Sequence, residues 1–251
     1  MWRTIFRSES IKFYKSPTVW FAAALCFAAL SFLFYQLSTD YFTQVRLALK
    51  AQGHLFGFTR EVVKPFWGWV LFLMMLLTPL LTANNLSLEF NRKTFNFWTL
   101  HRVPAKSLVL GKYFALLMLQ TLLLFLFLII PLSICLITTP DWGLLLSGFV
   151  CCWLVTAFSS AFCLAVHFFV PSLILSGLIF LGGIVMLALL PWLVPFVFLK
   201  PFAANLSPIE HAHALMNGRF IFADLFYFIF SLGALMILSM WGASRRLLQI
   251  L

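Results

Sequence analysis

Six apolar segments divide the sequence, each close to or above the roughly 20 residues that a helix needs to cross a bilayer. Of all residues, 63% are hydrophobic and 10% are charged, whereas soluble domains average about 25% charged residues. In lipid, each segment must bond its own backbone groups, which a helix does. We therefore predict an all-α integral membrane protein, with a single membrane domain over residues 1–251. The six transmembrane helices are expected near residues 17–37, 66–86, 108–131, 143–170, 173–199 and 222–243.

Residues 1–15 have the pattern of an amphipathic helix that lies in the membrane interface ahead of the first span. At about 100° per residue, the apolar side chains fall within one arc and the basic ones lie at its edge or outside it. The apolar side chains are those of Trp2, Ile5, Phe6 and Phe13. A Ser-Pro pair at residues 16 and 17 then separates this helix from the span.

Glu9 is the exception in this helix, because it projects into the middle of the apolar arc. A carboxylate in apolar surroundings needs a cation or backbone amides as partners. Glu9 therefore either docks against another part of the protein or faces water where the helix frays. The pattern of this helix leaves both interpretations open.

The stretch from Asn84 to Lys112 is a basic interruption between the second and third predicted spans. Its positive residues are Arg92, Lys93, Arg102, Lys106 and Lys112. Short loops rich in Lys and Arg stay on the cytoplasmic side of a membrane. In the six-span arrangement, the side that holds this stretch and both termini carries more Lys and Arg than the other. We therefore expect both termini in the cytoplasm.

Within this stretch, Glu89 and Thr94 lie on a segment of helix-compatible composition that Pro104 closes. Its aromatic residues are Phe90, Phe95, Phe97 and Trp98. The pattern predicts a short amphipathic element at the membrane surface, with apolar groups that could face a partner. A basic loop with aromatic anchors in the interface is the alternative.

The segment from Lys200 to Ile221 is interrupted by prolines and follows Pro191 and Pro195, which should kink or end the fifth helix. It is predicted to be a partly re-entrant hairpin or a simple surface loop. Its two histidines, at 211 and 213, lie beside Glu210. Two histidines at this spacing fall on different faces of a helix, so we expect no metal site here.

Small residues recur along the fifth predicted span and permit close contact between helices. They are Ser172, Ser176, Gly177, Gly182 and Gly183. This stripe predicts internal packing or a seam between two copies of the chain.

Several classes of function are disfavoured by what the sequence lacks. Gly111 and Lys112 are followed by Tyr113 and have no upstream glycine at the spacing of a phosphate-binding loop, so the chain does not bind ATP by that route. The centres of the spans carry no Asp, Glu, Lys or Arg, which disfavours a secondary transporter. The sequence shows no set of polar residues that would converge in an active site, which disfavours an enzyme. The net charge is +10, and the basic residues that carry it lie at the ends of apolar segments. This placement favours lipid headgroups over nucleic acid as their partners.

Three segments, taken in order, resemble the membrane subunit of ABC-2 type exporters, and within that family the gliding-motility-associated permease branch. ESIKFYKSPTV, which begins at Glu9, resembles the elbow helix of the family. The pattern E-x(4)-T-x(9)-P-x(6)-GK is matched by Glu89, Thr94, Pro104, Gly111 and Lys112. Near the end, LSPIEHAHALMNGRFIFADLFYF resembles a segment of the branch, with matches that include His211, Gly218 and Asp224.

This resemblance implies a permease subunit in the bacterial cytoplasmic (inner) membrane, with a cytoplasmic coupling helix between the second and third spans. Contact with a separate ABC ATPase, which would bind the ATP, is implied for Glu89, Thr94, Phe95, Trp98 and Pro104. A second permease subunit, identical or not, would complete the pathway, and no cofactor is expected in this chain. Structural or docking roles are implied for Glu9, Gly111, Lys112, His211, Gly218 and Asp224. An ATP-independent channel or secondary transporter is the alternative, and the sequence indicates no substrate.

Overall fold

The computed structural model describes residues 1–51, 57–91, 103–133, 141–170, 172–193, 200–219 and 221–250. The elements in these ranges are helical, in agreement with the predicted fold class. They are α1 (Trp2–Lys15), α2 (Pro17–Ala51), the π-helix η1 (Thr59–Val63), α3 (Lys64–Asn91), α5 (Ala105–Leu132), α6 (Trp142–Phe169), α7 (Leu173–Leu193), α8 (Lys200–Leu206), α9 (Pro208–Met216) and α10 (Phe222–Ile250).

Six of these helical segments are long and apolar enough to cross a membrane, which confirms the number of predicted spans. They are Pro17–Val45, Thr59–Thr82, Ala105–Leu132, Trp142–Phe169, Ile174–Leu193 and Phe222–Leu248. Their number and length indicate a multi-pass membrane protein.

The first helix of the bundle is longer than predicted, because α2 continues past residue 37 to Ala51. Polar side chains in this extension bond to the helix itself. The hydroxyls of Ser38, Thr39 and Thr43 each donate to the carbonyl four residues earlier. Hydroxyls satisfied in this way do not interrupt a helix, so polarity alone placed the predicted end too early.

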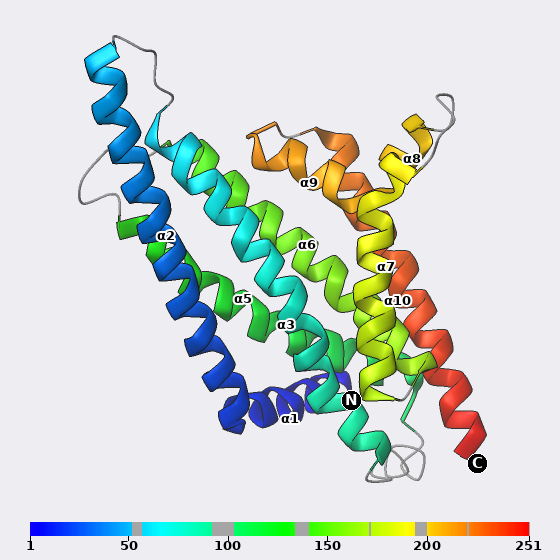
Figure 1. Cartoon of the computed structure of the whole chain (residues 1–251). Coiled ribbons are helices and arrows are strands. Elements are labelled where there is room, and N and C mark those ends of the chain that lie inside the picture. The colour runs from blue at the N-terminus through cyan, green and yellow to red at the C-terminus, as the bar shows by residue number, and fades with distance from the viewer. Residues whose placement is uncertain are drawn as a thin grey trace.

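Both termini lie at one end of the bundle, and α1 lies across that end (Figure 1). The short helices α8 and α9 lie at the opposite end (Figure 1). On α9, Ala212 and Leu215 are buried in one cluster with Cys151 and Val155 of α6. The segment between the fifth and sixth spans is thus a pair of short helices, the second of which is docked on the bundle.

Helix α6 is the centre of the bundle and packs against α3, α5, α7, α9 and α10. The indole of Trp67 packs against this helix at Gly148. A Cβ atom at residue 148 would lie 2.2 Å from Cδ1 of Trp67. The missing side chain therefore lets the helix that begins at Lys64 approach α6.

Of the three glycines in the small-residue stripe of α7, one lies in close contact with a neighbouring helix. A Cβ atom at Gly183 would lie 2.8 Å from the ring of Phe162 on α6, whereas one at Gly182 would have nothing within 4 Å. At Gly177 the nearest atom, on Pro79, is 3.9 Å away. Of the three glycines, only Gly183 is thus required by internal packing, and Ser176 of the same stripe is buried against His167 of α6.

Gly148→Ala should destabilise the protein by about 1–3 kcal/mol, because its methyl group would overlap the Trp67 indole. Gly182→Ala is the matched control. It should be neutral or stabilising by up to about 1 kcal/mol, since alanine favours a helix and its methyl group meets nothing. Unfolding by denaturing detergent in mixed micelles measures both, and equal stability of the two variants would contradict the packing.

Candidate functional site

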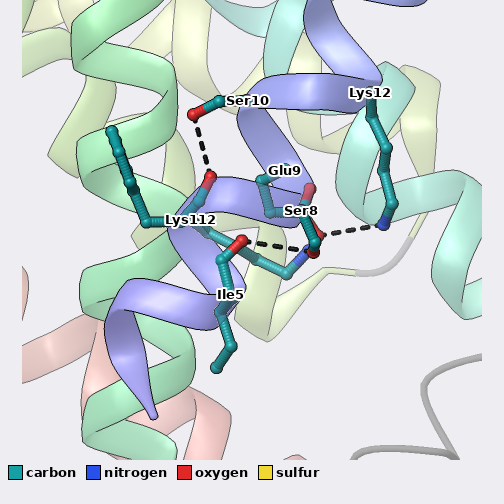
Figure 2. A network of polar contacts seen from close by, with 7 residues as sticks. Ile5, Ser8, Glu9, Ser10, Lys12 and Lys112 are labelled. Carbon is teal, nitrogen blue, oxygen red and sulfur yellow. Dashed lines mark hydrogen bonds and ion pairs between the residues drawn. The ribbon is translucent and has the colours of Figure 1, made fainter.

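The junction between α1 and α5 is the best-defined polar site at the end of the bundle that holds the termini. On α1, Ile5, Glu9 and Phe13 are one helical turn apart and all three are buried. Oε1 of Glu9 accepts hydrogen bonds from Nζ of Lys12 at 3.0 Å and from Nζ of Lys112 at 3.2 Å. Of the two interpretations left open for Glu9, the structure shows docking against another part of the protein, with Lys112 of α5 as the distant partner (Figure 2).

Gly111 brings the two helices close enough for this pair to form. A Cβ atom at residue 111 would lie 2.7 Å from Cγ2 of Ile5 and 3.1 Å from the carbonyl oxygen of Trp2. No side chain larger than hydrogen fits there without moving α1 away from α5. Both residues of α5 thus hold α1: Gly111 allows the two helices to approach, and Lys112 forms the ion pair with Glu9.

The ion pair is removed from water. Glu9 is 0% exposed and Lys112 is 2% exposed. Oε2 of Glu9 has no hydrogen-bond partner among the residues that the structure describes. Buried charges are costly unless they are paired, so each partner holds the other in place.

Lys112 was counted as the last positive charge of the basic stretch and also fell within the third predicted span. Its interpretation as a loop charge is wrong. Helix α5 begins at Ala105, so Lys106 and Lys112 are helical residues, and Lys112 is buried. An isolated lysine is read as a surface charge because its partner, Glu9, lies 103 residues away in the sequence.

The predicted coupling residues lie largely outside the described part of the chain. Thr94, Phe95 and Trp98 fall in residues 92–102, which the structure does not describe. Glu89 belongs to the last turn of α3, but its side chain is also outside the description. Pro104 is exposed and precedes the first residue of α5, where its carbonyl accepts bonds from the next helical turn.

A second polar cluster lies at the opposite end of the bundle. Nδ1 of His211 is 2.6 Å from Oδ1 of Asp224, and its Nε2 is 3.1 Å from the carbonyl oxygen of Asn205. Both ring nitrogens thus lie within hydrogen-bond distance of an oxygen atom. The ring stacks on Tyr227 with centroids 4.2 Å apart. These contacts join α8, α9 and α10.

The turn after α9 requires Gly218, whose φ is +75°. This left-handed conformation is unfavourable for residues with a Cβ atom. The side-chain amide of Asn217 contacts Nδ1 of His213 and donates to its backbone carbonyl. Within the described ranges, no group of three or more His, Cys, Asp and Glu side chains could hold a metal ion.

Two polar features were missed by sequence analysis. Gln120 joins three helices, since its Nε2 donates to Oγ1 of Thr78 at 2.9 Å and its Oε1 accepts from Oγ of Ser160. Its signal was an isolated amide within the third apolar segment. Arg246 of α10 donates to the carbonyls of Phe168 and Phe169 at the end of α6. No local pattern identifies these acceptors.

Comparison of the sequence with protein-family models gives no match, and comparison with curated proteins gives none either.

Lys112→Met should lower the free energy of unfolding by about 3 kcal/mol, because it leaves Glu9 buried with only the half-exposed Lys12. Adding Glu9→Gln to this variant should restore part of the loss, because the unpaired charge is then removed. A double-mutant cycle in mixed micelles measures the coupling. Additive effects of the two substitutions would exclude the pair.

Asp224→Ala should loosen α8 and α9, since it removes the carboxylate that holds His211. A hydrogen bond to a charged group is worth about 1.5–3 kcal/mol, so amide exchange in these helices should become roughly tenfold faster or more. Glu210→Ala, at an exposed position of α9, is the control. Hydrogen–deuterium exchange read by mass spectrometry compares them, and unchanged exchange in α9 would contradict a clamping role.

Proposed function

We propose that this chain is the membrane permease subunit of an ATP-driven exporter of the ABC-2 type, in a bacterial cytoplasmic membrane with both termini in the cytoplasm. The observation that carries the proposal is the docking of the interfacial helix α1 on α5 by the buried Glu9–Lys112 pair. The three sequence patterns that resemble this family support it, and two of them supply this pair.

The position of the pair suits the transmission of movement from a cytoplasmic partner. The segment between α3 and α5 leads directly into Ala105, the first residue of α5. Seven residues later, Lys112 fastens α5 to α1. A displacement of that segment by a partner would therefore act on α5 and α1 as one unit, because a buried ion pair resists separation.

The chain itself offers no source of energy for transport. Its Gly-Lys pair at 111 and 112 is used for the contact with α1, and the sequence contains no phosphate-binding loop. In the proposal, ATP closes two ATPase subunits that bear on two permease subunits. ATP then shifts the population between two states of the pathway through its different affinity for them.

The distribution of charge supports the proposed orientation. The end that holds the termini carries Arg3, Arg7, Lys15, Lys106 and Arg245 among its described basic side chains. Retention of positive segments in the cytoplasm accounts for this arrangement. The coupling residues Glu89, Thr94, Phe95 and Trp98 are assigned to the same side, together with Pro104.

The test is purification of the tagged chain from its native membrane in mild detergent, followed by an ATPase assay of what is retained. Phe95→Ala with Trp98→Ala should release a nucleotide-hydrolysing subunit that the wild-type chain retains. Trp192→Ala removes an 83% exposed tryptophan from α7 and is the matched control, which should retain the subunit. Glu89→Ala should keep the subunit but abolish the stimulation of its ATP hydrolysis by the permease.

Two outcomes would contradict the proposal. One is retention of an ATPase by the double variant at the wild-type level. The other is a chain that purifies without any nucleotide-hydrolysing subunit and alone passes solutes into liposomes. The second outcome would favour a channel or secondary transporter.

A further inference from the structure

An apolar groove runs along the outside of α5 and ends at α1. Its volume is about 720 Å³, within the roughly 300–1,000 Å³ of small-molecule sites. The wall on α5 includes Phe114, Met118, Leu122 and Phe125, all of which are exposed. Trp2 of α1 closes the end next to α1, with its ring centroid 5.9 Å from that of Phe114.

Two arginines of α1 line the end of this apolar groove. Arg3 and Arg7 are one helical turn apart, exposed, and on the groove lining. Among the described residues neither arginine forms an ion pair. A planar guanidinium binds phosphate through two parallel hydrogen bonds. The groove thus combines an apolar wall with two cations at one end, which is the polarity of an anionic amphiphile.

The part of α5 that lines the groove is about as long as one leaflet of a bilayer is deep. Phe114 and Phe125 are eleven residues apart on α5, which corresponds to about 16 Å at 1.5 Å per residue. Half of a hydrocarbon core of about 30 Å has nearly the same depth. An acyl chain that followed this wall would place its phosphate at the level of α1.

Few carboxylates at this end of the bundle could form ion pairs with Arg3 and Arg7 in place of a lipid phosphate. The chain has only seven acidic residues. Of these, Glu9 is buried between two lysines and Glu89 belongs to the last turn of α3. A second copy of the chain placed symmetrically on the groove would bring its own Arg3 and Arg7 to the same contact, and like charges would meet. The charges favour a lipid over a second copy.

We propose that this groove is a binding site for one anionic phospholipid of the leaflet next to α1, with its phosphate on Arg3 and Arg7 and an acyl chain along α5. The site needs only that the chain lies in a membrane, so it does not depend on the exporter proposal. It places a lipid against the same helix that the Glu9–Lys112 pair fastens to α5.

Native mass spectrometry of the delipidated full chain, titrated with phosphatidylglycerol or with phosphatidylcholine, tests the site. The wild-type chain should bind one phosphatidylglycerol more tightly than phosphatidylcholine. Arg3→Gln with Arg7→Gln should weaken phosphatidylglycerol binding roughly 25-fold, at a factor of about five for each arginine. Phosphatidylcholine binding should change little.

Two further variants separate charge from shape. Lys15→Gln with Lys106→Gln removes the same net charge from exposed positions outside the groove and should leave phosphatidylglycerol binding unchanged. Leu122→Trp should fill the groove and weaken both lipids while the arginines remain. Thermal unfolding of each variant shows that it is folded.

Equal affinity of the wild-type chain for the two lipids would overturn the proposal. So would full binding of phosphatidylglycerol by the double arginine variant. A dimer that Leu122→Trp dissociates, in a chain that binds neither lipid, would assign the groove to a second copy and would also overturn it.

Discussion

The need to bond every polar group inside a water-free layer is the constraint on which this structure depends. Several hydroxyls in the spans bond to their own helices, as Thr78 and Thr82 do with the carbonyls four residues earlier. Among the described residues, the buried Ser159 hydroxyl and Trp67 indole N–H are exceptions without a partner. The one amide of the third span, Gln120, bonds to α3 and α6 instead. An unpaired amide there would cost several kcal/mol, so these bonds set the positions of three helices relative to one another.

The same constraint acts on full charges at the ends of the bundle. Glu9 and Lys112 fasten the first helix to α5, and Arg246 fastens the last helix to the terminal carbonyls of α6. The first and last elements of the chain are thus both held by charged groups at one end. At the opposite end, His211 and Asp224 join the short helices to α10.

Helix α1 is the element that both proposals share. One of its faces, with Ile5, Glu9 and Phe13, is buried in the bundle. Its edge, with Arg3 and Arg7, borders the apolar groove. A partner that moves α5 and a lipid that occupies the groove would therefore both act on this helix. Together, the two proposals would link membrane composition to coupling through the position of α1.

The residues of each segment by themselves predicted six apolar helices long enough to cross a membrane, a helix ahead of the first of them, and a partner for Glu9 wherever it is buried. Hydropathy and helical periodicity are local properties, and the cost of a lone carboxylate is the same wherever it is buried. The identity of that partner was decided only by tertiary structure. Lys112 was counted with the basic stretch although it fell within the third predicted span, and Gly183 could not be told apart from Gly182, because both depend on which helix faces meet. Contacts between residues far apart in sequence come from packing, and no local pattern contains them.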